Sequence, residues 1–212
     1  MIKNNILVLF LGILAGFLLI IILLGNGLLF SKLTNSFIDK WSAKLEGKEN
    51  SRFAKISSNF KLSFESQVES DIFDAQQSGM EISPSFATEG KSSLLVEFPP
   101  NAEYPGISFD LFGKNCLDWK DMKEFSFDVF NSIDSPATLI VQIRSGEKYP
   151  KKQFKKEFVL PALKTATIII SRNNLEKELD LSKISHLTIF MNNLQTTFRL
   201  YFDNMKVVSN NK

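Results

Sequence analysis

Short runs in which apolar and polar residues alternate dominate the chain beyond residue 59. In residues 124–130, Phe125, Phe127 and Val129 share one side, and polar residues fall between them. A period of two is typical of β-strands with one buried face. The pattern predicts strands at 60–64, 93–98, 107–112, 124–130, 139–143, 154–160, 166–170, 187–191 and 198–202.

Turn-forming residues such as Pro99-Pro100-Asn101 separate these runs at intervals of about 8–15 residues. No long segment with a helical period of 3.6 interrupts them. The chain also contains 20 Phe residues, many of them on the inward side of the predicted strands. The spacing and the density of aromatic side chains predict an all-β fold, in which two sheets pack face to face as a sandwich.

The N-terminal pattern is different, because residues 6–24 carry no charge and are all Leu, Ile, Val, Phe, Gly or Ala. A helix of this length, at about 1.5 Å per residue, nearly spans the ~30 Å hydrocarbon core of a bilayer. The competing interpretation is a removable signal peptide. The run is longer than an ordinary signal core, however, and its exit offers no small-residue cleavage site. We therefore predict a transmembrane signal-anchor in residues 1–30.

Residues 31–58 are polar and are predicted to form a juxtamembrane stalk, with one sizeable domain in 59–212. Phe37, Trp41 and Leu45 are spaced by four, which favours a short amphipathic helix within the stalk. Lys and Arg counts on the two sides of the apolar run do not favour an N-terminus in the cytoplasm. The very short N-terminal flank is typical of a signal-anchor. It predicts a single-pass membrane protein whose C-terminal domain is extracytoplasmic (periplasmic or extracellular).

The remaining composition mainly excludes classes of function. The net charge is +2, and the one basic cluster, in 151–156, is short, so nucleic acid is not a predicted partner. With a single cysteine, Cys116, and a single histidine, His186, neither an intramolecular disulfide nor a Cys/His zinc site is expected. His186 starts an apolar run and is predicted to be structural. Carboxylate pairs such as Asp118 and Asp121 are scattered without a nucleophile motif, so no catalytic residue is predicted.

Six segments follow one another in the chain: Leu62-Ser-Phe-Glu65, 87–96, Asp118-Trp119, 125–131, 179–184 and 200–207. In kind and order they resemble carbohydrate-binding modules with the galactose-binding-like jelly-roll fold, over residues 60–208. The resemblance implies a jelly-roll β-sandwich that binds a ligand and has no catalytic role.

In such modules an acid on the first strand and an acid on the last strand often hold a structural calcium ion, together with carbonyl oxygens of one loop. The matching acids are Glu65 and Asp203, and the matching loop runs from Thr88 to Lys91. Ca²⁺ takes six to eight oxygen ligands, which carboxylates and carbonyls supply. The resemblance thus implies structural Ca²⁺ at Glu65, Lys91 and Asp203. The alternative is that both acids are exposed or hydrogen bonded to Thr and Asn neighbours.

Sugar recognition typically combines flat aromatic faces with directional polar groups. The family's Asp-Trp pair matches Asp118-Trp119, and this Trp is usually a packing residue, so we predict that Trp119 lies in the core. The candidate aromatic platforms are Tyr104, Tyr149 and Tyr201, with Gln142, Arg144 and Asn192 as polar partners.

These observations predict a membrane-anchored, non-catalytic module that presents a jelly-roll domain outside the cytoplasm to bind glycan. The alternative is an envelope scaffold, or a protein-interaction and assembly module, that uses the same fold without binding sugar. The membrane, and either a glycan or an envelope protein, are therefore the predicted partners.

Overall fold

A computed structural model describes residues 60–111, 116–146 and 152–209. The predicted transmembrane segment (1–30), the stalk (31–58) and Tyr149 lie outside the described residues. Within the described ranges, no helix has the length and apolar character needed to cross a membrane.

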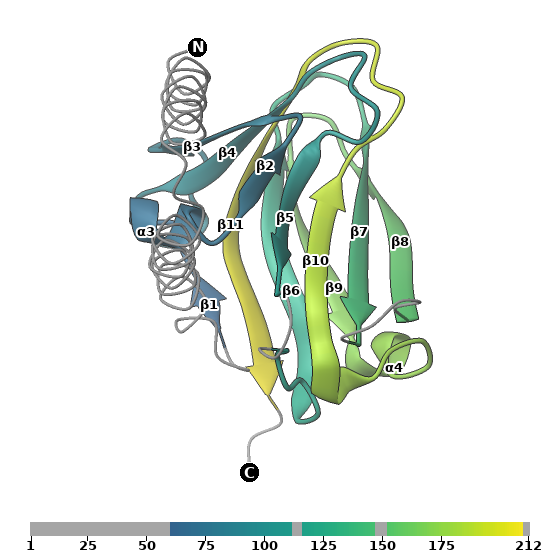
Figure 1. Cartoon of the computed structure of the whole chain (residues 1–212). Coiled ribbons are helices and arrows are strands. Elements are labelled where there is room, and N and C mark those ends of the chain that lie inside the picture. The colour runs from purple at the N-terminus through teal and green to yellow at the C-terminus, as the bar shows by residue number, and fades with distance from the viewer. Residues whose placement is uncertain (1–59, 112–115, 147–151, 210–212) are drawn as a thin grey trace, which may run out of the picture. The chain divides into compact units, whose positions relative to one another are not determined.

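The described chain is almost entirely β-structure (Figure 1). Two single-turn α-helices and one 3₁₀ turn interrupt the strands: α3 (Gln67–Ser70), α4 (Arg172–Leu175) and η1 (Leu181–Lys183). The strands are β1 (Lys61–Leu62), β2 (Asp74–Gln76), β3 (Gly79–Ser83), β4 (Ser93–Phe98), β5 (Gly106–Asp110), β6 (Met122–Asn131), β7 (Ala137–Ser145), β8 (Lys152–Leu160), β9 (Thr165–Ser171), β10 (Ile184–Phe190) and β11 (Phe198–Ser209).

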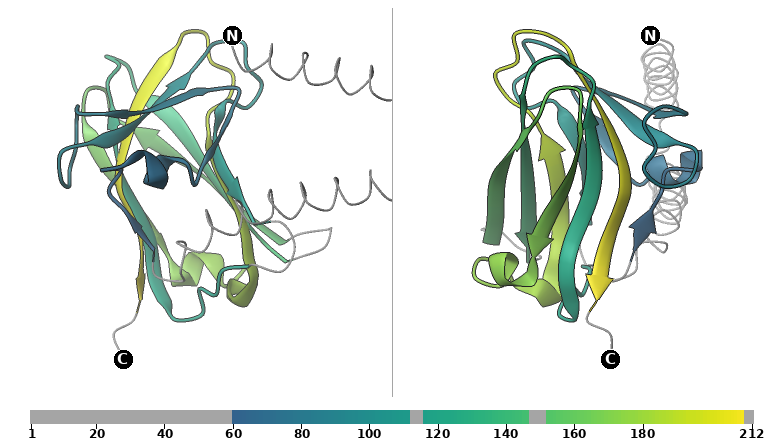
Figure 2. Two further views of the ribbon diagram at one scale, coloured as in Figure 1. Left: turned by 60° about the vertical axis from the view of Figure 1, so that its left-hand side comes forward. Right: turned by 180° about the vertical axis from the view of Figure 1, so that it is seen from behind.

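The strands form two antiparallel sheets that pack as layers (Figures 1 and 2). The five-stranded sheet has the order β2-β5-β10-β7-β8. The six-stranded sheet has the order β3-β4-β11-β6-β9, and β1 pairs with β11 beyond the end of β4. The chain crosses repeatedly from one sheet to the other, which is the jelly-roll arrangement. The predicted all-β sandwich is confirmed.

Aromatic side chains from both sheets fill the space between the layers. Trp119 is 1% exposed and stacks on Phe125, with ring centroids 5.7 Å apart. Phe60 and Phe127 contact Phe125 at 6.3 and 5.7 Å, and Phe60 also meets Phe109 of the other sheet at 6.5 Å. The prediction that Trp119 is a packing residue is therefore confirmed.

The sequence pattern missed β2 and β3, whose residues are exposed or only half-buried. Strands without a buried face show no regular alternation. The first predicted strand is also shorter than expected, because Phe64 has a left-handed backbone (φ +53°). Glu65 therefore follows β1 and does not lie within a strand.

The basic cluster borders the five-stranded sheet. Lys152, Lys155 and Lys156 are exposed on β8, an edge strand. Charged side chains on an edge strand discourage pairing with other chains, so this part of the cluster has a structural explanation that requires no nucleic acid.

Candidate functional site

The outer surface of the five-stranded sheet carries polar side chains, which we call the polar face. On β10, Leu187 and Ile189 are fully buried in the core, so the alternating residues point to the outer side. Strand pairing places the outward residues of β5, β7 and β8 beside them. The polar face comprises Ser108, Asp110, Ile140, Gln142, Arg144, Gln153, Lys155, Glu157, His186, Thr188 and Phe190.

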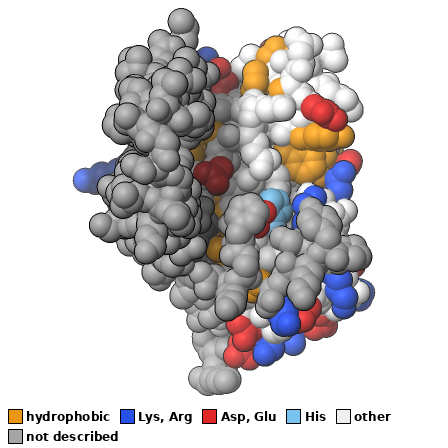
Figure 3. Space-filling view, viewed as in Figure 1, with side chains coloured by type: hydrophobic (Ala, Val, Ile, Leu, Met, Phe, Trp, Pro, Cys, Tyr) orange, Lys and Arg blue, Asp and Glu red, His pale blue; other side chains and the backbone are white. Residues whose placement is uncertain are grey.

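Strand register aligns these residues in rows across the sheet. Asp110, His186, Arg144 and Gln153 form one row, and Ser108, Thr188, Gln142 and Lys155 form the next. Successive rows are about 7 Å apart, the spacing of alternate residues in a strand. Figure 3 looks onto this side of the molecule, where the histidine lies near basic and apolar side chains.

Hydrogen bonds within the polar face orient the polar groups of its more exposed side chains. Arg144 Nη2 donates to Gln142 Oε1 (3.1 Å), and Gln142 Nε2 donates to Gln153 Oε1 (2.9 Å). His186 Nδ1 lies 3.2 Å from Asp110 Oδ2. Gln142 and Arg144 are half-buried, and Gln153 is exposed. A ligand therefore meets donors and acceptors that are already oriented, which lowers the entropy lost on binding.

An aromatic pair closes one end of the polar face. Phe190 is 6% exposed, and Tyr104 packs edge-on against it, with centroids 5.8 Å apart. Lys155 Nζ lies 5.6 Å from the centre of the Phe190 ring, within the range of a cation–π contact. The residue beside Phe190 on β5 is Gly106, where a Cβ atom would lie 2.7 Å from Phe190 Cβ. The same Cβ atom would lie even closer to the backbone oxygen of Ile189, so a larger residue at 106 would push β5 and β10 apart.

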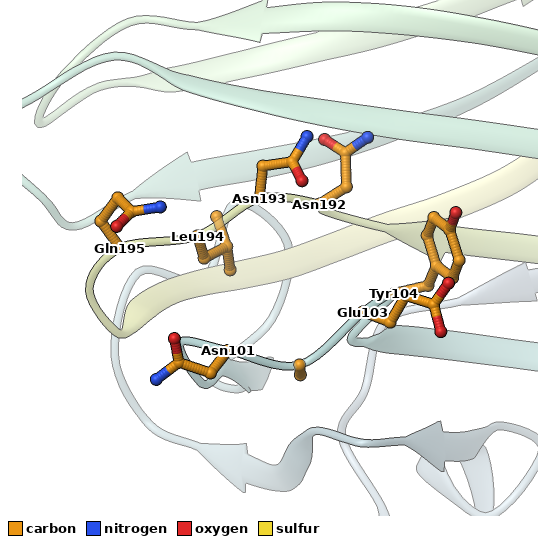
Figure 4. Close-up of a pocket in the computed structure, with 8 residues that line it drawn as sticks. Asn101, Glu103, Tyr104, Asn192, Asn193, Leu194 and Gln195 are labelled. Carbon is orange, nitrogen blue, oxygen red and sulfur yellow. The ribbon is translucent and has the colours of Figure 1, made fainter.

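The structure brings together most of the candidate sugar-binding residues. Gln142 and Arg144 are neighbours on the polar face, and Tyr104 adjoins its aromatic end. Asn192 follows β10 and, with Tyr104, lines a hollow between two loops (Figure 4). Tyr201 does not join them, because it lies on β11 of the other sheet.

Sequence reasoning missed Thr188, Phe190 and Lys155 as members of the site. The signal was present, because His186, Thr188 and Phe190 alternate with Leu and Ile in 184–190. The sequence pattern predicted a strand in this run, but its alternate residues were not assigned to the site. His186 is 8% exposed, in keeping with its predicted structural role.

A second cluster of polar residues lies on the six-stranded sheet, where carboxylates hold a loop that we call the clamped loop (88–92). Asp203 Oδ2 accepts hydrogen bonds from the backbone N–H groups of Thr88 (2.6 Å) and Glu89 (2.7 Å). Glu65 Oε1 accepts from the N–H groups of Lys91 (2.8 Å) and Ser92 (2.9 Å). The structure thus brings together the two acids and the loop of the predicted calcium site.

Asp128 of β6 completes this cluster. Its carboxylate accepts hydrogen bonds from Thr167 Oγ1 (2.6 Å), Thr88 Oγ1 (2.7 Å) and Asn204 Nδ2 (3.1 Å). Burial raises the pKa of Asp128, but the three hydrogen bonds and nearby Lys206 outweigh this effect, so the pKa is lowered overall. The pKa of Glu65 is lowered by the backbone hydrogen bonds from Lys91 and Ser92.

This arrangement does not fit a calcium ion as it stands. Asp203 and Glu65 face N–H donors of the clamped loop, whereas Ca²⁺ needs oxygen acceptors around it. In the ranges that the structure covers, no group of three or more Asp, Glu, His or Cys side chains could hold a metal. Asp203 instead accepts hydrogen bonds from Thr88 and Asn204. Hydrogen bonding to Thr and Asn neighbours was the alternative to calcium in the sequence analysis. Calcium stays a prediction, and the loop peptides would have to turn for the ion to bind.

Chelation tests this point directly. We expect the melting temperature of the protein to be the same in EDTA and in millimolar Ca²⁺, because hydrogen bonds alone close the clamped loop. If Ca²⁺ bound the folded protein and its free concentration were about 100 times the Kd, it would add about 2.7 kcal/mol to the free energy of unfolding. The melting temperature would then rise by several degrees. A calcium-dependent rise of that size would show that the loop rearranges around the ion.

The lowered pKa of Asp128 also predicts a pH dependence of stability. A carboxyl group whose folded pKa is below its unfolded value stabilises the fold above about pH 4, and this contribution disappears as the pH falls through the folded pKa. We expect the difference in free energy of unfolding between wild type and D128N to be largest near neutral pH and to shrink in acid. Urea denaturation at a series of pH values measures it. A difference that stays constant down to about pH 2 would contradict the assignment.

Comparison with known proteins identifies the fold. No protein-family profile and no curated protein matches the sequence. Among solved structures, an exo-beta-agarase matches with a TM-score of 0.58 and 13% identity, over 71% of this chain. The matched part is 25% of the agarase chain. A family 11 carbohydrate-binding module from Clostridium thermocellum, solved with a beta-1,3-1,4-mixed-linked tetrasaccharide, matches with a TM-score of 0.54 and 17% identity, over 71% of this chain and 95% of the module.

A family 11 carbohydrate-binding module of the cellulosomal cellulase Lic26A-Cel5E of Clostridium thermocellum matches with a TM-score of 0.52 and 16% identity, over 73% of this chain and 96% of the module. At these identities the likeness concerns the fold. The described domain therefore has the jelly-roll β-sandwich fold of carbohydrate-binding modules, as the resemblance in the sequence implied.

Proposed function

We propose that the domain is a carbohydrate-binding module that binds glycan on the polar face of its five-stranded sheet. The observation that carries this proposal is the hydrogen-bonded set Arg144, Gln142 and Gln153 near the aromatic pair Tyr104 and Phe190. Sugar hydroxyls both donate and accept hydrogen bonds, and sugar C–H surfaces pack on aromatic rings. The polar face offers both kinds of contact within one surface.

The charges of the polar face favour neutral or weakly charged glycans. Arg144 and Lys155 supply positive charge, and Asp110 and Glu157 supply negative charge. Opposite charges at this spacing largely cancel for a ligand that spans the rows.

The module is proposed to bind without catalysing a reaction. The acids considered for hydrolysis have local structural roles: Asp180 accepts from Ser182 N (3.0 Å) at the start of η1, and Asp118 accepts from Lys120 N (3.0 Å).

The N-terminal apolar segment supports a membrane-anchored module with its domain outside the cytoplasm. A tether at a surface keeps several copies close together, so that weak individual contacts with a polymer add up.

One observation favours the alternative, a protein-interaction module. On the six-stranded sheet, Phe86 is 47% exposed, stacks on Phe130 at 3.8 Å and meets Tyr201 at 4.7 Å. Phe86 also has a left-handed backbone (φ +55°), which is uncommon for a bulky residue. An exposed aromatic cluster of this kind is typical of protein contacts.

Binding of the full-length protein to a glycan panel tests the two functions. The panel contains mixed-linkage β-glucan, xylan, agarose and envelope polysaccharides, and the protein is held in a detergent without a sugar head group. We expect the wild type to bind at least one glycan of the panel. The F86A variant should bind the same glycan equally well. The protein-interaction module would be favoured if the wild type binds no glycan of the panel but captures a membrane protein, and if F86A no longer captures that protein.

A further inference from the structure

Two loops form a hollow at one end of the sandwich, beyond the aromatic end of the polar face (Figure 4). The loops join β4 to β5 and β10 to β11, and they are tied by hydrogen bonds from Met191 N to Pro105 O (3.0 Å) and from Asn101 N to Leu194 O (3.4 Å). Asn101 and Asn193 have left-handed backbones (φ +62° and +54°), which turn both loops sharply. The hollow has a volume of about 430 Å³, within the range of small-molecule sites.

The side chains that line this hollow are mainly carboxamides: Asn101, Asn192, Asn193 and Gln195. Each offers two N–H donors and one oxygen acceptor, so together they complement hydroxyl groups, which also donate and accept. The other polar lining residues are Tyr104 and one acid, Glu103, and among the described residues no Lys, Arg or His lines the hollow. This chemistry suits a neutral polyhydroxylated ligand and disfavours an anion.

Tyr104 connects the hollow with the polar face. Tyr104 lines the hollow, and its ring also makes an edge-type contact with Phe190. Asn192 follows Phe190 by two residues on the same chain segment. A glycan that packs on the exposed ring of Tyr104 therefore has its next unit beside the carboxamides.

We propose that the hollow is a separate subsite that binds one neutral sugar unit, adjacent to the units held by the polar face. This inference rests on the proposed function and adds to it a preference for glycans with an uncharged unit at this end. Glu103 lowers the affinity for acidic sugars such as uronic acids at this position.

Nuclear magnetic resonance of the full-length ¹⁵N-labelled protein, in a phosphocholine detergent, tests the subsite. Asn and Gln side-chain amides give separate signals, so Asn192, Asn193 and Gln195 report on the hollow, and Gln142 and Gln153 report on the polar face. The probes are glucose, galactose and xylose, with glucuronate as the anionic counterpart. We expect at least one neutral sugar to shift the signals of the hollow with a Kd of the order of millimolar, and glucuronate to bind at least about ten-fold more weakly.

Replacing Asn192 and Gln195 together by alanine is expected to weaken this binding at least about ten-fold. Asn101 and Asn193 are left unchanged, because their backbone conformations depend on asparagine. The matched control is N173A, an exposed asparagine in α4. The inference is overturned if no neutral sugar shifts the signals of the hollow, if the double variant binds like wild type, or if glucuronate binds equally well.

A second titration, with the mixed-linkage β-1,3-1,4 tetrasaccharide, separates this inference from the proposed function. Shifts at both sets of amides support the subsite and the proposed function. Shifts at Gln142 and Gln153 without shifts at the hollow overturn the subsite and leave the proposed function intact. Shifts confined to the hollow support it as a sugar site and contradict the polar face as the main binding surface.

Discussion

The D203N variant is expected to lower the free energy of unfolding by about 3 kcal/mol, because a buried acceptor is replaced by a donor. Asp203 is 1% exposed, and its two oxygens accept from the N–H groups of Thr88, Glu89 and Asn204 at 2.6–2.7 Å. An asparagine amide would direct its NH₂ group at one or more of these N–H groups in either orientation. Urea denaturation of the full-length protein measures the change.

Asp134 provides the matched control, because it is an exposed acid on a loop of the same sandwich. D134N should change stability by no more than about 0.5 kcal/mol, as expected of a surface substitution. If D203N proves as stable as D134N, the carboxylate does not hold the clamped loop in the way described.

The R144A variant is expected to weaken glycan binding about 10- to 100-fold without loss of stability, since hydrogen bonds from a charged donor contribute about 1.5–3 kcal/mol. Arg144 is half-buried on the polar face, and Gln142 fixes its guanidinium group. Titration calorimetry with a glycan bound by the wild type gives the affinities. R144K retains the charge but loses the planar fork, and we expect an intermediate affinity.

Arg199 is the control for R144A, because it forms an ion pair with Glu97 (2.8 Å) on the opposite sheet. R199A should bind glycan like the wild type. If R199A weakens binding and R144A does not, the ligand lies on the six-stranded sheet.

Most strands of the sandwich could be predicted from the sequence, because apolar and polar residues alternate regularly in strands with one buried face. The alternation of Phe125, Phe127 and Val129 corresponds to β6, where these three side chains are fully or almost fully buried. The pattern ended β11 too early, at Phe202. Asn204 has a left-handed backbone (φ +48°), and the pairing with β6 shifts register between Asp203 and Lys206. Such a bulge breaks the alternation although the strand continues.

The candidate site was less readable, because its parts become neighbours only through strand order. Tyr104 and Phe190 lie far apart in the sequence, and β5 beside β10 brings them together. For the clamped loop, the sequence identified Glu65 and Asp203 as partners but not the direction of the loop peptides. Whether N–H or C=O groups face a carboxylate depends on local backbone angles, which residue types do not specify at this loop.

Hydroxyl-radical footprinting of the full-length protein, with and without a glycan that it binds, tests most directly which face is used. Tyr104 and Phe86 are both exposed aromatic residues, at 53% and 47%, and they report on opposite sheets. Our account predicts that the glycan protects Tyr104 from oxidation and leaves Phe86 unchanged. Protection of Phe86 with continued oxidation of Tyr104 would contradict it.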